Sequence, residues 1–108
     1  MIYELRVYRA IPGKMPALLR RFEDHTLTIW ERMGIRLVGF WTTAVGESNQ
    51  ELTYILAWQT MAEHETLWKK FAADAEWIAV AAESEREGPL VANIASQLLR
   101  PTAFSPMK

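Results

Sequence analysis

The chain has 108 residues, enough for one small domain, and 50% of them are hydrophobic, with five tryptophans among them. Its net charge is −1 and its basic residues are scattered, so it offers no basic cluster for nucleic-acid binding. It has no cysteine, which excludes disulfides, thiolate nucleophiles and cysteine-ligated metals, and no apolar run long enough to cross a bilayer, so we expect a soluble cytoplasmic protein.

The first segment predicts a strand followed by a helix. Residues 2–9 alternate between two faces, which is the period-2 pattern of a β-strand. Pro12 and Gly13 end this strand, because proline lacks a ladder donor and glycine permits a turn. In residues 14–33 the apolar side chains recur three and four positions apart, which indicates an amphipathic helix that ends at Gly34.

The middle of the chain predicts a hairpin. Residues 36–45 and 51–59 have the pattern of two antiparallel strands, joined by the turn-forming residues 46–49. Gly39 lies inside the first of these strands, where a glycine indicates a bulge or the close approach of a backbone or a ligand. A bulge is the more common cause.

The last third predicts a helix in two pieces and a final strand. Thr60 followed by Glu63 matches a capping box that opens the second helix. Asp74 can cap a further helical piece, so we expect a kink or a restart near Ala73. A Gly-Pro pair ends the helical region, and residues 90–100 form the fourth strand.

These elements follow the order β-α-β-β-α-β along a single domain, residues 1–108. That order is typical of an α+β, ferredoxin-like fold, in which a four-stranded antiparallel sheet carries two helices on one face. The sequence therefore predicts a sheet with one covered and one uncovered face.

The middle strands carry apolar side chains on both faces, although two helices can cover only one. We assign Leu52, Tyr54, Leu56 and Trp58 to one face and Ile55 and Ala57 to the other, with Leu37 and Trp41 opposite Val38 and Phe40. Soluble monomers rarely expose so large an apolar face, so we expect a homodimer whose two sheets pack into a dimeric α+β barrel. The alternative is that the extra aromatic residues fill a large core under the helices.

Several segments resemble the NIPSNAP family over nearly the whole chain. They are Tyr3-Glu4-Leu5-Arg6, Pro12-Gly13-Lys14, Leu37-Val38-Gly39-Phe40-Trp41-Thr42-Thr43, Leu99-Arg100-Pro101-Thr102 and Phe104-Ser105-Pro106. Ala75 and Ala103 depart from the pattern, since the family has proline there. The resemblance implies a dimeric α+β barrel but supplies no catalytic residue. The wider barrel superfamily includes cofactor-independent monooxygenases, lactone isomerases and haem-degrading enzymes, which is an analogy of fold alone.

His25 is the strongest catalytic candidate. It follows Phe22 by three positions and precedes Ile29 by four, which places it on the helix stripe that faces the sheet. There it could act as a general base or orient a ligand hydroxyl. The alternative is a structural histidine bonded to a backbone carbonyl or to a hydroxyl such as that of Tyr54.

Glu4 and Arg6 share a face of the first strand, which is central in this topology, so we expect them to line the barrel. Arg6 could hold a ligand carboxylate there. The alternative is an ion pair between two subunits that adds little net energy.

Six residues are candidates for ligand binding, because aromatic walls and one cationic group suit a pocket for a small hydrophobic molecule. They are Tyr3, Arg6, Trp41, Tyr54, Trp58 and Trp68. Core packing explains the aromatic members equally well. We assign His64, which lies between two glutamates, to an exposed helix face and not to a metal site, since no second histidine lies four residues away.

The sequence thus predicts a protein that binds a small, partly hydrophobic ligand or a partner protein. The alternative function is a cofactor-independent monooxygenase or isomerase, with His25 as the base in a cavity between sheet and helices. The sequence has no nucleotide-binding loop and no serine-hydrolase motif, and we expect neither a cofactor nor a metal.

Overall fold

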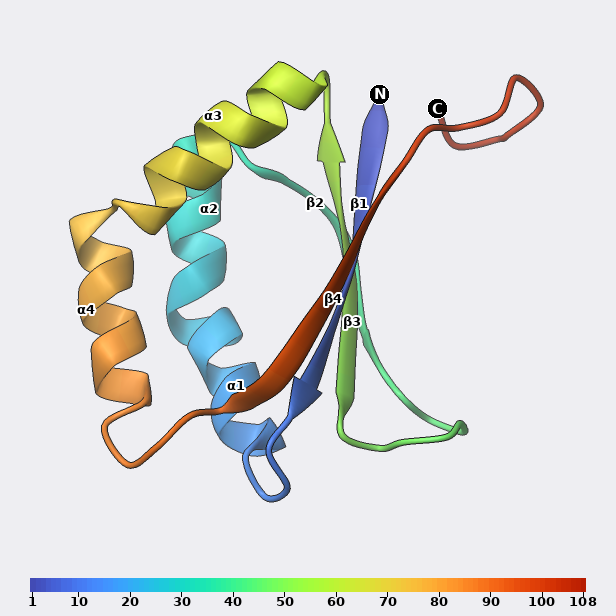
Figure 1. Ribbon diagram of the computed structural model, residues 1–108. Helices are drawn as coiled ribbons and strands as arrows, with labels where there is room; N and C mark the ends of the chain where they lie inside the picture. Colours follow the sequence, from blue (N-terminus) through green and yellow to red (C-terminus); the bar gives the residue numbers. More distant parts are fainter.

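Four strands form one antiparallel sheet, and every helix lies on the same side of it (Figure 1). The computed structural model describes all of residues 1–108. In chain order the elements are β1 (Ile2–Ala10), α1 (Met15–Arg21), the π-helical segment η1 (Phe22–Thr26), α2 (Leu27–Met33), β2 (Arg36–Thr42), β3 (Glu51–Trp58), α3 (Met61–Ala72), α4 (Ala75–Ser84) and β4 (Val91–Leu99). The strand order β2-β3-β1-β4 confirms the ferredoxin-like α+β prediction. None of the helices has the length and apolarity needed to span a bilayer.

The register of β1 decides which of its side chains lie under the helices. This strand is paired on both edges, with β3 on one side and β4 on the other. The residues of β1 that face the helices include three polar ones, whose partners on β3 are Leu56 for Glu4, Tyr54 for Arg6 and Leu52 for Tyr8. All three partners are buried, so a row of polar side chains runs along the floor of the helix-covered layer.

The first helix is not the continuous α-helix that the pattern predicts. Its middle segment η1 widens, because the amide of Leu27 donates to the carbonyl of Phe22, five residues earlier. The wider turn advances each residue by less than the ~100° of an α-helix, so Phe22 and Thr26 are buried and His25 turns to solvent. The predicted position of His25 against the sheet is therefore wrong.

The local signals in the second helical region are confirmed. The hydroxyl of Thr60 accepts a hydrogen bond from the amide of Glu63 at 3.0 Å and so caps α3. The carboxylate of Asp74 accepts one from the amide of Trp77, also at 3.0 Å, and caps α4. The chain leaves the helical path between these two elements, at the expected position near Ala73.

The bulge that Gly39 predicts lies in β2. The pairing of β2 with β3 shifts by one residue between Leu37 and Gly39, which leaves Val38 outside the ladder. This extra residue turns Leu37 and Phe40 to the same face, so their predicted assignment to opposite faces is wrong. The ring of Trp41 also covers Gly39, since a Cβ built there would lie 2.9 Å from it.

Aromatic side chains fill the space between the sheet and the helices. The ring of Trp30 lies 5.7 Å from that of Phe22, 5.6 Å from that of Tyr54 and 5.9 Å from that of Phe71, with tilted or edge-on contacts. Much of the aromatic content is therefore core, as the alternative to dimerisation supposes.

The other face of the sheet remains apolar and has no helix over it (Figure 1). By register its apolar residues are Tyr3, Leu5, Val7, Trp41, Ile55, Ala57, Ala95 and Leu99. The polar residues at its centre are Thr53 and Gln97. We call this surface the helix-free face.

Candidate functional site

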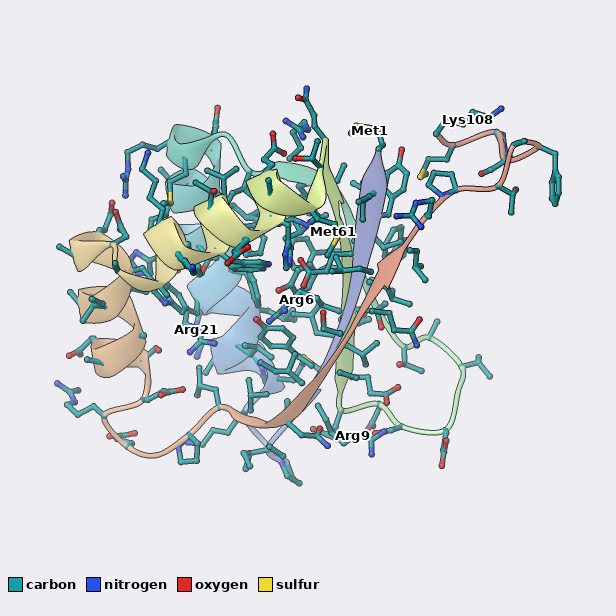
Figure 2. All side chains as sticks on the ribbon, turned by 45° about the horizontal axis from the view of Figure 1, so that its top comes forward. Met1, Arg6, Arg9, Arg21, Met61 and Lys108 are labelled. Atoms are coloured by element: carbon teal, nitrogen blue, oxygen red, sulfur yellow. The ribbon has the colours of Figure 1, made fainter.

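Arg6 lies at the centre of a polar network between the sheet and the helices (Figure 2). Its Nε donates to the hydroxyl of Tyr54 at 2.7 Å, its Nη1 to the carboxylate of Glu4 at 3.1 Å and its Nη2 to the hydroxyl of Tyr8 at 3.4 Å. Its guanidinium also lies 4.8 Å from the ring centre of Trp68. With 17% of the side chain exposed, this charge is held largely away from water.

Glu4 is the anionic partner in this network, and it is only 2% exposed. The indoles of Trp58 and Trp68 donate to its Oε1 at 3.1 and 2.9 Å, and the hydroxyl of Ser96 donates to its Oε2 at 2.8 Å. Burial alone would raise the pKa of Glu4, but the hydrogen bonds from Trp68 and Ser96 and the charge of Arg6 outweigh burial and lower that pKa. The carboxylate is thus stabilised in its ionised form.

His64 also reaches this carboxylate. Its Nε2 lies 3.3 Å from Oε1 of Glu4, and its ring stands edge-on to that of Trp58 at 5.2 Å. Only 21% of the side chain is exposed. The predicted assignment of His64 to an exposed helix face is therefore wrong, because α3 turns this residue toward the sheet.

The pKa shifts of Arg6 and Tyr54 favour a charged guanidinium and a neutral phenol. Burial lowers the pKa of Arg6, but the oxygens of Tyr54, Tyr8 and Glu4 more than offset this, so the pKa of Arg6 is raised. Burial raises the pKa of Tyr54, which keeps its phenol neutral. The network therefore combines the cation of Arg6, the anion of Glu4 and the neutral phenol of Tyr54, all within one chain. The prediction that Glu4 and Arg6 line the space between two sheets, or pair across subunits, is wrong.

The phenols form a chain of hydrogen bonds that ends at Tyr8. Tyr54 accepts from Arg6 and donates its own proton to the oxygen of Tyr8 at 3.1 Å. That oxygen also accepts from Arg6. The hydroxyl hydrogen of Tyr8 has no acceptor within the protein, and the donors behind it polarise it toward donation.

Tyr8 lies in the wall of a groove of about 490 Å³, between α4 and the strands β1 and β4. Its principal lining residues are Tyr8, Arg21, Trp77, Glu85, Val91 and Ile94. Most of this wall is apolar, so a space suited to an apolar molecule lies beside the buried network. We call this space the Tyr8 groove.

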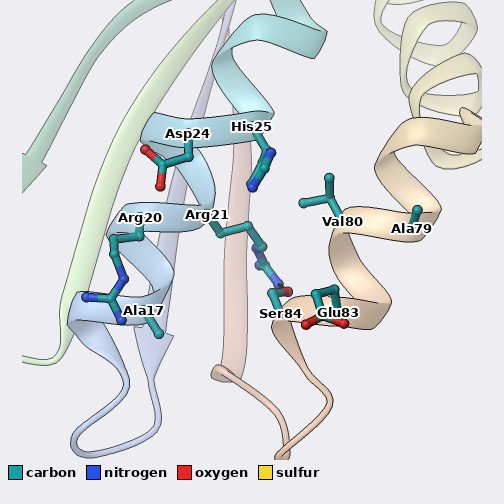
Figure 3. Close-up of a pocket in the computed structure, with 9 residues that line it drawn as sticks. All are labelled: Ala17, Arg20, Arg21, Asp24, His25, Ala79, Val80, Glu83 and Ser84. Atoms are coloured by element: carbon teal, nitrogen blue, oxygen red, sulfur yellow. Dashed lines mark hydrogen bonds between the residues drawn. The ribbon is translucent and has the colours of Figure 1, made fainter.

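His25 lies in a different groove, between α1 and α4 (Figure 3). This space of about 480 Å³ is open to solvent, and Arg20, Asp24 and Glu83 also line it. His25 is exposed there and forms no hydrogen bond to Tyr54, whose hydroxyl is bonded to Arg6 and Tyr8. His25 does not line the Tyr8 groove, which lies between a helix and the sheet, so it does not reach the kind of cavity that we expected.

The six predicted ligand-binding residues do not share one pocket. Arg6, Tyr54, Trp58 and Trp68 come together in the buried network. Tyr3 and Trp41 belong by register to the helix-free face. The predicted set thus divides between the two sides of the sheet.

Sequence reasoning did not single out Tyr8, and it placed His64 on an exposed face. Tyr8 follows Arg6 by two residues on a strand, so the alternation that relates Glu4 to Arg6 extends to it. His64 precedes Trp68 by four residues and Phe71 by seven, which is the spacing of one helix face. Both signals were present, but the Tyr8 groove depends on β4, which is 83 or more residues away from Tyr8.

Comparison with known proteins gives a consistent result. The NIPSNAP family model matches residues 3–106. An uncharacterized NIPSNAP domain protein from Burkholderia xenovorans is 29% identical with a TM-score of 0.85, over 98% of this chain and 99% of that chain. A NIPSNAP family protein of unknown function from Agrobacterium tumefaciens is 28% identical with a TM-score of 0.86, over 100% of this chain and 94% of that chain.

A more distant structure shares the fold alone. It is a putative antibiotic biosynthesis monooxygenase from Nitrosomonas europaea, 9% identical with a TM-score of 0.65, over 94% of this chain and 98% of that chain. No match was found among curated proteins. The family model covers nearly the whole chain, and the fold agrees with it, so this chain belongs to the NIPSNAP family.

Proposed function

We propose that this protein is a homodimer and that each subunit binds a small, partly hydrophobic molecule in the Tyr8 groove. The observation that carries the proposal is Tyr8, which lines a largely apolar groove and whose hydroxyl hydrogen, at the end of a buried chain of donors, has no acceptor within the protein. A ligand oxygen would accept that hydrogen, and its apolar body would pack on Trp77, Val91 and Ile94.

The buried charges behind Tyr8 support a functional interpretation. Taking Glu4 and Arg6 out of water is expensive, and well-packed apolar side chains would often fold as stably. Clusters of this kind, next to a concave surface, are typical of binding and catalytic sites. Their role in this proposal is to fix and polarise the hydroxyl of Tyr8.

A binding experiment tests the proposed ligand site in the Tyr8 groove. Isothermal titration with cinnamyl alcohol, an aromatic molecule with one hydroxyl oxygen, should give measurable binding to the wild type. Tyr8→Phe should weaken it about fivefold, the value of one ordinary hydrogen bond. Tyr3→Phe, which removes a phenol from the helix-free face, should leave it unchanged. Equal losses in both variants, or binding that Tyr8→Phe leaves intact, would contradict the proposal.

The helix-free face supports the homodimer. A second copy would cover its apolar residues, and burying ~600 Å² of apolar surface would contribute roughly 15 kcal/mol before association entropy is subtracted. Phe104, in the segment after β4, is also exposed and available for a contact between subunits. In light scattering we expect the mass of two 12.4 kDa chains. Ile55→Lys should shift that mass toward one chain, whereas a wild-type monomer at working concentrations would refute the dimer.

An enzyme remains the alternative proposal, as a cofactor-independent monooxygenase or isomerase. The feature that favours it is again Tyr8, whose hydroxyl could stabilise negative charge as it develops on a substrate oxygen. A catalytic role for His25 would require a substrate bound in the other groove, between α1 and α4. The proposed location of the protein is the cytoplasm, which cell fractionation would test.

A further inference from the structure

Arg21, the last residue of α1, is a buried cation without an adequate anionic partner. It is 8% exposed, and its Nε forms no hydrogen bond. Its Nη1 donates to the hydroxyl of Ser84 at 3.2 Å and lies 3.6 Å from the carboxylate of Glu85, beyond a normal hydrogen bond. Figure 3 shows the side chain extending from α1 toward Ser84 on α4.

This arrangement is unusual because buried charges are normally paired and hydrogen-bonded. Arg6, by comparison, has Glu4 at 3.1 Å and two phenol oxygens as acceptors. Glu85 is 45% exposed, so water screens its charge and its side chain is free to move away from Arg21. The guanidinium of Arg21 therefore has donor capacity that the protein itself does not use.

Arg21 also has the right surroundings to receive a ligand. Its guanidinium lies 5.3 Å from the ring centre of Trp77, and both residues line the Tyr8 groove. Stacking on an indole fixes the plane of the guanidinium, which is how arginine presents its donors to a planar carboxylate. Because Glu4 neutralises Arg6, the charge that an incoming molecule meets is set by Arg21 and its weak partner Glu85.

We propose that the Tyr8 groove selects molecules that carry a carboxylate on an apolar or aromatic body, and that Arg21 binds the carboxylate. Tyr8 supplies a second donor, Glu85 is displaced toward solvent, and the body of the ligand packs on Trp77 and Ile94. The groove volume of about 490 Å³ is adequate for a molecule of this size. This inference rests on the proposed function, since it names the chemical class that the same groove would take.

The test compares two probes with the same body, cinnamate and cinnamyl alcohol, by isothermal titration. Cinnamate should bind at least tenfold more tightly than the alcohol, because it adds a charge-assisted hydrogen bond. Arg21→Gln should remove that preference and leave the affinity for the alcohol within about threefold. Arg21 lines both the Tyr8 groove and the groove that contains His25, whereas Arg20 lines only the latter. Arg20→Gln, which removes the same charge one residue earlier, should therefore keep the preference.

A second variant keeps the test decisive if Arg21→Gln fails to fold. Glu85→Gln removes the internal competitor, so it should tighten cinnamate binding severalfold without affecting the alcohol. Glu87→Gln, an exposed change outside the groove, is its matched control. A gain of affinity cannot arise from general destabilisation.

Two results would overturn the inference in distinguishable ways. If the alcohol binds as tightly as cinnamate, and Glu85→Gln changes neither, the groove binds small molecules but does not select carboxylates. If neither probe binds the wild type, the proposed function fails together with the inference.

Discussion

Replacing Glu4 by glutamine perturbs the buried network most directly. The variant keeps the shape of the side chain but puts an amide in place of one carboxylate oxygen. Both oxygens accept hydrogen bonds, from Trp58 and Trp68 on one side and from Arg6 and Ser96 on the other, so an NH₂ group must face a donor in either orientation. Arg6 also loses its counter-ion. We expect a loss of about 3–5 kcal/mol in the free energy of unfolding.

The loss should depend on pH in a defined direction. Burial raises the pKa of Glu4, but its hydrogen bonds and Arg6 lower it further, to a net value below the ordinary 4.5. A depressed pKa in the folded state stabilises the protein above the unfolded pKa, and this contribution is lost as the pH falls through the folded pKa. The difference between wild type and Glu4→Gln should therefore be full near neutral pH and shrink below pH 4.5.

Urea unfolding measures both the loss of stability and its dependence on pH. The protein concentration is held fixed, because dimerisation would otherwise shift the apparent stability. Glu65→Gln is the control, because this carboxylate is exposed and pairs only with Lys69 on the surface. It should change stability by less than about 1 kcal/mol at any pH. A Glu4→Gln loss as small as that of the control, or a loss that grows on acidification, would refute the reasoning.

Two further predictions concern single hydrogen bonds, and both are measured by the same unfolding assay. Thr60→Ala removes the cap of α3 and should lower the free energy of unfolding by about 1 kcal/mol. Thr60→Ser keeps a hydroxyl and should retain most of that stability. Equal stability of the wild type and both variants would contradict the capping role. Tyr54→Phe leaves Nε of Arg6 without a partner and removes one of the two donors to the oxygen of Tyr8, so it should lower the free energy of unfolding by about 1–3 kcal/mol. The same change should weaken cinnamyl alcohol binding, because it interrupts the chain that polarises Tyr8, and unchanged binding would show that the chain is not needed.

The sequence predicts the architecture well, because each element carries local signals. The alternation in residues 2–9 and the caps at Thr60 and Asp74 involve neighbours a few residues apart, and the structure confirms them. The strand order also follows from rules of connection, which leave few ways to join these elements. The other strand bounds agree to within one residue, but β2 stops at Thr42 and not at residue 45.

The errors arise where one residue changes the geometry of a regular element. The wide turn η1 rotates His25 away from the sheet, and the bulge at Gly39 brings Leu37 and Phe40 to one face. The wide turn leaves no mark in the hydrophobic period, and Gly39 signals the bulge without showing which side chains it reorients. The first helix was thus predicted at the right place in the chain, but its wide turn puts His25, the predicted catalytic residue, on the solvent side.

The candidate site could be predicted only in part for a different reason. Glu4 and Arg6 are two residues apart on a strand, so their common face follows from the sequence. The partners that define their chemistry come from β3, α3 and β4, and the weak pairing of Arg21 depends on how α4 packs on α1. Such long-range packing is set by the whole fold.

Chemical-shift mapping of the isotope-labelled protein with cinnamyl alcohol tests the central claim most directly, because it locates the bound molecule residue by residue. We predict the largest shifts at the indole N–H of Trp77 and at the backbone amides of Val91 to Ile94, with small shifts at Ile55 and His25. Shifts confined to the helix-free face, or to the groove that contains His25, would contradict the assignment of the Tyr8 groove as the binding site.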